Sequence, residues 1–149
     1  MKTILVLSPH LDDAVLSCGG WMAQAAEAGE NVVVYNLFCA RYQGPLSPAA
    51  SELHASWGHP MDITGLRIAE DQRALGVLGA GAIYGDVRDL IYRQDASGAW
   101  LYPAMDDIMG QRNPQDDALV EYYFEKVATL FSVEEVEIYA PLGIGGHID

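Results

Sequence analysis

The chain has 149 residues, of which half are hydrophobic and 19% are charged, a composition typical of one folded domain rather than a disordered chain. The net charge of −13, with eight Lys and Arg residues in total, argues against a nucleic-acid partner, because neutralising phosphates requires clustered cations. No apolar run approaches the roughly 20 residues that cross a bilayer, so we expect no membrane span. The first apolar run is too short for a signal-peptide core, and we expect a cytoplasmic protein.

The first strand, helix and strand are expected within the opening 40 residues. Residues 4–7 (Ile-Leu-Val-Leu) form a continuous apolar run, typical of a strand that is covered on both faces. Apolar residues then recur at helical spacing over residues 12–28, and Gly29 ends that helix. Residues 31–38 (Asn-Val-Val-Val-Tyr-Asn-Leu-Phe) predict a second strand, so the two strands should be parallel with a right-handed crossover.

The rest of the chain alternates irregular segments with regular ones. Prolines and glycines predict an irregular segment over residues 41–64, a helix over 66–78, a short strand over 82–84 and a second irregular segment over 88–114. Asp116 or Asp117 can cap a helix that runs to about Phe131, and residues 136–140 predict the last strand. We therefore expect one α/β domain over residues 1–149, a Rossmann-like three-layer sandwich whose mainly parallel sheet has helices on both faces. Such folds bind ligands beyond the carboxyl ends of their strands.

Three chemically active side chains, His10, Asp12 and Asp13, follow the first predicted strand. Imidazole and carboxylate together suit Zn²⁺ and other divalent first-row metals. If one aspartate binds the metal, the other is free to accept a proton from water, which is the pairing that hydrolysis requires. Either acid alone could instead cap the next helix, but three such groups in four positions favour a metal site.

His147 and Asp149 form a His-x-Asp group after the last predicted strand, at the same edge of the sheet. A carboxylate beside a histidine can fix its tautomer and keep it charged, ready to stabilise an oxyanion or protonate a leaving amine. His54 and His59 lie five residues apart in the first irregular segment, where a solvated or substrate-facing loop is a better explanation than a metal site. The aromatic residues Trp57, Trp100 and Tyr102 could stack on a sugar.

Several of these segments resemble the LmbE-like, or PIG-L, family of N-acetylglucosaminyl deacetylases. Ser8-Pro9-His10-Leu11-Asp12-Asp13-Ala14 resembles the family's Pro-His-Pro-Asp-Asp-Glu signature, with Cys18-Gly19-Gly20 as its usual continuation. The helix around Arg67 and Glu70 resembles the family's second helix, and Gly146-His147-Ile148-Asp149 resembles its His-x-Asp-His motif.

The resemblance implies a zinc-dependent hydrolase that removes the acetyl group from N-acetylglucosamine units of a small-molecule conjugate, with Fe²⁺ able to occupy the same ligands. It implies that His10 and Asp13 bind the metal and that Asp12 is the general base. It also implies that His147 stabilises the oxyanion and that Asp149 supports the site. Arg67 and Asp86 fall where family members hold the sugar.

The chain departs from the family pattern at three places. Leu11 replaces a proline, Ala14 replaces a glutamate, and the family's third metal ligand, the second histidine of His-x-Asp-His, would be the residue after Asp149. We therefore expect a truncated domain that is the N-terminal portion of an enzyme. The alternative is an inactive sugar-binding relative of the same fold. The sequence does not reveal whether the chain forms a homo-oligomer.

Overall fold

The computed structural model describes residues 2–58, 62–131 and 135–149. Within these residues a four-stranded sheet has the order β3-β2-β1-β4, and every neighbouring pair is parallel. The strands are β1 (Thr3–Ser8), β2 (Asn31–Phe38), β3 (Gly81–Val87) and β4 (Val136–Tyr139). The prediction of an α/β fold with a parallel sheet is confirmed, and β2 has the predicted bounds.

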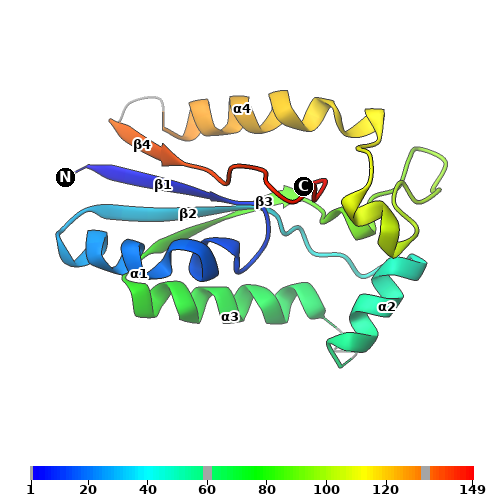
Figure 1. Ribbon diagram of the computed structural model, residues 1–149, viewed down its shortest axis with the longest axis horizontal. Coiled ribbons are helices and arrows are strands. Elements are labelled where there is room, and N and C mark those ends of the chain that lie inside the picture. The colour runs from blue at the N-terminus through cyan, green and yellow to red at the C-terminus, as the bar shows by residue number, and fades with distance from the viewer. Residues whose placement is uncertain (1, 59–61, 132–134) are drawn as a thin grey trace.

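Helices cover both faces of the sheet, as predicted. Figure 1 shows α1 (Asp13–Glu27) and α3 (Ile63–Leu78) below the sheet and α4 (Ala118–Leu130) above it. Alternate side chains of each strand enter opposite layers, because successive residues of a strand point to opposite faces. Ile4 and Val6 pack in the layer between the sheet and the helices α1 and α3, whereas Leu5 packs in the layer that contains Tyr123 of α4.

The segment predicted to be irregular over residues 41–64 contains a helix, α2 (Pro48–Ser56), and α3 begins at Ile63 instead of Leu66. Pro48 suggested irregular backbone, but proline is well tolerated in the first turn of a helix, where its missing N–H has no intrahelical partner. The buried Ser47 caps α2 by accepting a hydrogen bond from the Ala50 N–H, 2.9 Å away. Its hydroxyl also donates to the Ile91 carbonyl, which ties α2 to the next irregular segment.

The second irregular segment, residues 88–114, contains short 3₁₀ helices instead of extended loops. These are η1 (Leu90–Tyr92), η2 (Met105–Met109) and η3 (Pro114–Asp116). η1 and η2 pack with α2 over a core of their own, at the end of the sheet where the strands have their carboxyl termini. The predicted side-chain cap of α4 is wrong: Asp117 stands at the cap position without a capping hydrogen bond, and Asp116 turns inward to Arg93.

A bulge between β2 and β3 shapes the same end of the sheet. The strand register shifts between Asn36 and Phe38, where Gly85 of β3 lies directly against β2. A Cβ atom added to Gly85 would meet the Leu37 carbonyl oxygen at 2.1 Å, so only glycine fits this approach. In the described part of the chain, no helix is both long and apolar enough to cross a membrane.

Candidate metal and catalytic site

The turn between β1 and α1 is held by the fully buried side chain of Ser8. Its hydroxyl donates to the His10 carbonyl at 2.6 Å and accepts from the Ala14 N–H at 3.1 Å. The turn also contains Asp12, which has a φ of 128° and is the one non-glycine residue with positive φ among the residues described. Such a conformation costs of the order of 1–3 kcal/mol and concentrates at functional sites. The turn therefore places His10, Asp12 and Asp13 at the expense of local strain.

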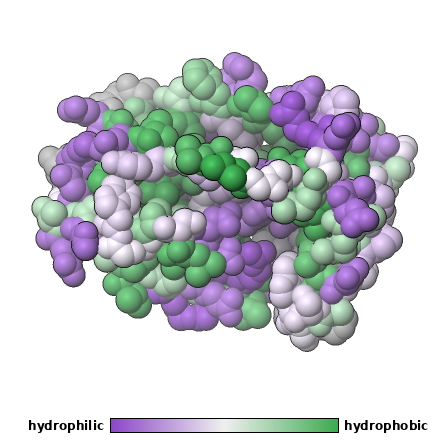
Figure 2. Space-filling model, viewed as in Figure 1, coloured by the Kyte–Doolittle hydropathy of each residue, from purple (hydrophilic) through white to green (hydrophobic). Residues whose placement is uncertain are grey.

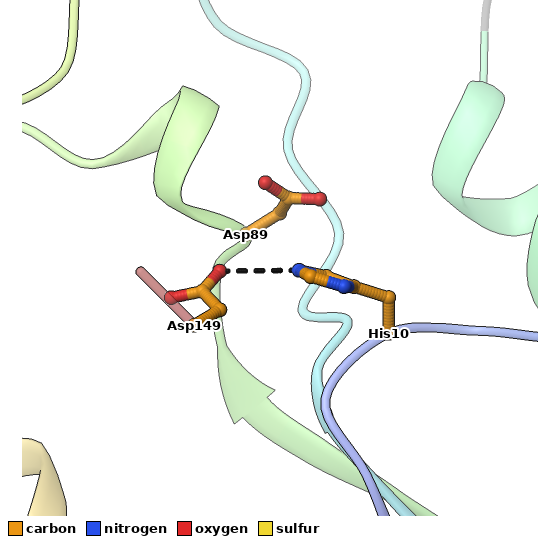
Figure 3. A group of neighbouring side chains, drawn as sticks. All are labelled: His10, Asp89 and Asp149. Carbon is orange, nitrogen blue, oxygen red and sulfur yellow. Dashed lines mark hydrogen bonds and ion pairs between the residues drawn. The ribbon is translucent and has the colours of Figure 1, made fainter. Parts of the chain in front are cut away.

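Carboxylates flank both nitrogens of the His10 ring. Nδ1 lies 3.4 Å from Oδ2 of Asp13, and Nε2 lies 3.3 Å from Oδ2 of Asp149. Figure 3 shows the Asp149 carboxylate facing the ring, with Asp89 above it. Ligand atoms of His10, Asp89 and Asp149 all lie within 4.8 Å of one another. The fold thus brings the ends of β1 and β4 together, as predicted, and adds Asp89 from the segment after β3.

The electrostatics of this group favour a positive charge. Burial alone lowers the pKa of His10, but its hydrogen bonds to Asp13 and Asp149 and the nearby Asp89 charge outweigh burial and raise that pKa to about 10. Burial raises the pKa of Asp89, and His10 opposes that rise. Because several carboxylates share one imidazole, a divalent cation would neutralise them better than a proton does.

The Asp13 side of the ring offers one pair of ligand atoms for a metal. Two ligand atoms about 2.1 Å from a tetrahedral zinc lie about 3.4 Å apart, which is the separation of His10 Nδ1 from Asp13 Oδ2. Asp149 is already engaged on both oxygens, by the Arg93 guanidinium and by the Leu90 N–H. Metal-bound histidines usually donate their second ring N–H to a carboxylate. The Asp149 carboxylate, which faces Nε2 of His10, is placed to accept that hydrogen bond.

Asp12 lies beside these groups but does not contact the His10 ring. Its carboxylate is 56% exposed and lies 3.7 Å from the Arg67 guanidinium. Arg67 also donates to the Leu11 carbonyl at 3.1 Å and rests 5.2 Å from the centre of the Trp57 ring. Burial raises the pKa of Asp12, and Arg67 partly opposes the rise. An accessible carboxylate with a raised pKa is suited to accept a proton from water.

His147 lies edge-on to His10, with ring centres 4.7 Å apart. The Asp149 backbone N–H donates to Nδ1 of His147 at 3.2 Å, so the neutral ring carries its proton on Nε2. Burial and the His10 charge lower the pKa of His147. The structure differs from the expected pairing of the Asp149 carboxylate with His147: that carboxylate contacts His10, and His147 instead accepts from the Asp149 backbone N–H.

One sequence-predicted residue lies elsewhere, and the structure adds two residues that the sequence did not identify. The Asp86 carboxylate pairs with Tyr122 and Lys126 of α4, and the structure does not bring it to the His10 group. Asp89, three residues further on, is the acid that faces His10; its place just after a strand was the signal that could have identified it. Arg93 had no recognisable signal, because its partners Asp116 and Asp149 are distant in sequence.

The weaker candidates are placed as follows. His54 contacts the Tyr92 hydroxyl at 2.6 Å, and His59 lies outside the described residues. Trp57 is 40% exposed and lies against the Arg67 guanidinium, whereas Tyr102 is buried and its hydroxyl donates to Asp116. Of the proposed sugar-stacking residues, Trp57 is therefore exposed and contacts Arg67, a residue predicted to hold the sugar.

A cavity of about 770 Å³ opens beside His10 and Asp13. Most of its lining is hydrophobic and comes from α1 and from the segment after β4, including Trp21, Leu142 and Ile144. Figure 2 shows strongly hydrophobic atoms gathered over that segment, where Leu142 and Ile144 are each 88% exposed.

Comparison with known proteins assigns this chain to a family. Residues 5–132 match the family model "PIG-L: GlcNAc-PI de-N-acetylase". The chain belongs to this family. No curated protein matched the chain. The sequence resemblance described above is thereby confirmed.

Solved structures agree with that assignment. A deacetylase–bog complex from the teicoplanin biosynthesis pathway is 36% identical, with a TM-score of 0.86 over 97% of this chain and 57% of the other. The zinc inhibited form of teicoplanin deacetylase Orf2 is 35% identical, with a TM-score of 0.85 over 97% and 57%. The A40926 pseudoaglycone deacetylase Dbv21 is 34% identical, with a TM-score of 0.76 over 97% and 52%. The PIG-L chain described here thus spans somewhat more than half the length of these relatives.

Proposed function

We propose that the protein containing this chain is a metal-dependent hydrolase that removes the N-acetyl group from an N-acetylglucosamine-type sugar conjugate. The observation that carries the proposal is the His10 ring, held between the carboxylates of Asp13 and Asp149, with the accessible acid Asp12 beside it. The family's description and the deacetylase names of the relatives support an acetylated amino-sugar as the substrate. The free thiols of Cys18 and Cys39 are usual for a reducing compartment and support a cytoplasmic location.

His10 and Asp13 would hold Zn²⁺, or Fe²⁺, which accepts the same ligand types. When bound, such an ion polarises the amide carbonyl and lowers the pKa of water. Arg67 and Asp89 line a small hollow next to the site, together with Phe38 and Tyr92. We assign the sugar to Arg67 and Asp89, because Asp86 is held by α4.

Proton transfer in the proposed reaction involves Asp12 and His147. Asp12 accepts a proton from the water that attacks the acetamide carbon, and His147 donates its Nε2–H to the developing oxyanion. When the carbon–nitrogen bond breaks, the leaving amine must gain a proton. Asp12, which has taken the proton of the attacking water, can give it to that amine. Acetate and a free amino-sugar result.

The test compares acetate release and metal content in the full-length protein, two site variants and one control variant. Asp12→Asn should retain the metal and lose turnover by about 10²-fold or more, because only the base is removed. His10→Ala should lose both, while Asp86→Asn should remain close to wild type. Equal metal loss in both site variants would contradict the assigned roles. A wild-type protein that binds the sugar without a metal would favour the sugar-binding alternative.

A further inference from the structure

The Arg93 side chain lies behind the candidate site and touches no atom of the proposed metal ligands. It is 8% exposed, and each of its guanidinium nitrogens has a partner. Nε donates to the Arg88 carbonyl at 2.9 Å, one terminal nitrogen donates to Asp116 at 2.8 Å, and the other donates to Oδ1 of Asp149. A fully engaged guanidinium holds its acceptors at fixed angles, because its donors form a rigid plane.

The opposite oxygen of Asp149 contacts His10. Oδ2 lies 3.3 Å from Nε2 of the ring and also accepts from the Leu90 N–H at 3.2 Å. The Asp149 side chain is 1% exposed, so water does not compete for these contacts. Holding Oδ1 therefore fixes where Oδ2 stands, and Oδ2 fixes the rotation of the His10 ring.

Arg93 is itself held from two sides. Asp116 accepts a second hydrogen bond from the buried Tyr102 hydroxyl at 2.7 Å, and that hydroxyl accepts from the Asn113 N–H at 2.9 Å. The face of the guanidinium lies 4.5 Å from the centre of the Phe38 ring, at the end of β2. The segment over residues 88–117 is thereby connected to the His10 ring through one side chain.

We propose that Arg93 is a positioning residue, which orients His10 for metal binding by clamping Asp149. This proposal rests on the proposed metal site at His10 and Asp13. A partner that orients a ligating histidine typically changes metal affinity by about 10–100-fold when it is removed. A glutamine side chain cannot donate to Asp116 and Asp149 at once as the guanidinium does. Arg93→Gln should therefore weaken metal binding by about 10–100-fold.

The experiment measures Co²⁺ and Zn²⁺ affinity by chelator competition in the full-length protein, together with the visible spectrum of the Co²⁺ form. Arg93→Gln, Asp149→Asn and the double variant form a cycle, and Arg112→Gln, which removes an exposed arginine paired with Asp117, is the matched control. We expect each single variant to lose about 10–100-fold in affinity and to change the Co²⁺ spectrum. The double variant should lose little more, because Arg93 acts through Asp149.

Additive losses in the cycle, or an Arg93→Gln protein with wild-type affinity and spectrum, would overturn the role of Arg93. Arg93→Lys gives a second arm if the glutamine variant does not fold: lysine keeps the charge but not the planar fork, so affinity should remain below wild type. A wild-type affinity in a folded Arg93→Lys protein also overturns the proposal. A wild-type protein without Co²⁺ or Zn²⁺ affinity would refute the proposed metal site itself, which is a separate result.

Discussion

Asp12 combines an accessible carboxylate with a backbone conformation that most side chains avoid. Its φ of 128° lies where only glycine is free of steric conflict, yet the Ser8 and Ala14 contacts hold the turn in place. The place of Asp12 beside Asp13 left open which acid is the base, and the family resemblance implied Asp12. It could not show the strain, because backbone angles at a turn depend on the contacts that close it.

Replacing Asp12 by glycine should separate stability from activity. Asp12→Gly relieves the strained φ, so we expect it to unfold with a free energy about 1 kcal/mol higher than Asp12→Ala, which retains the strain. Both variants lose the Arg67 ion pair and the proposed base, so these losses cancel in the comparison and both should be inactive. Urea unfolding of the two proteins measures the difference. A glycine variant less stable than the alanine variant would show that the turn is unstrained.

At the scale of elements, close packing at the carboxyl end of the sheet depends on β3 lying directly against β2. Gly85 permits that approach and Asn36, on β2, is buried beside it. Strand periodicity predicted both strands, but it could not predict the bulge, because a bulge is a property of two strands in register. The same holds for α2, whose start depends on a serine cap that is buried only after the chain folds.

Two glycine-to-alanine substitutions should have opposite effects. Gly85→Ala forces a Cβ atom to within 2.1 Å of the Leu37 carbonyl oxygen, so unfolding should become easier by more than about 2 kcal/mol. Gly76→Ala, in α3, meets nothing within 4 Å and should stabilise by about 0.5–1 kcal/mol, since alanine is the better helix former. Thermal unfolding of both variants checks the pair. A neutral Gly85→Ala would mean that the bulge rearranges freely.

Asp71 joins α3 to the sheet and predicts a pH dependence of stability. Its carboxylate accepts from Asn36 at 3.0 Å and Tyr84 at 2.8 Å, and burial raises its pKa above the ordinary value of 3.8. The folded state therefore binds this proton more tightly than the unfolded state. As the pH rises from 3.8 to the folded pKa, Asp71 lowers the free energy of unfolding, and at higher pH that loss of stability remains.

Asp71→Asn removes that titration while keeping an acceptor oxygen for both partners. Its new N–H can also serve Asn36 Oδ1, which is buried without a partner in the described part of the chain. We expect the asparagine variant to gain stability relative to wild type as pH rises from about 3.5 to 7, measured by urea unfolding at each pH. A constant difference across that range would indicate that Asp71 titrates normally. Exposed Glu125→Gln is the control for general charge effects.

For the whole chain, the net charge of −13 is the dominant electrostatic fact. Like charges repel over about 30 Å at 0.01 M salt but only about 8 Å at 0.15 M, so added NaCl should stabilise the folded state. We expect the melting temperature to rise as the salt concentration increases across that range. Glu125→Gln removes one of two acids spaced i, i+4 on α4, so the melting temperature of this variant should rise less with salt. A melting temperature that falls with salt would mean that the ion pairs outweigh the repulsion.

The sequence by itself determined the class of fold, the four strands, three of the helices and the group of residues after β1, because these depend on local periodicity and on residues adjacent in the chain. Only the tertiary structure decided that Asp149 serves His10, that Asp89 replaces Asp86 at the site, and that Arg93 connects Asp116 with Asp149. Those contacts join residues far apart in sequence, and the direction of a side chain is set by the packing of the elements that carry it.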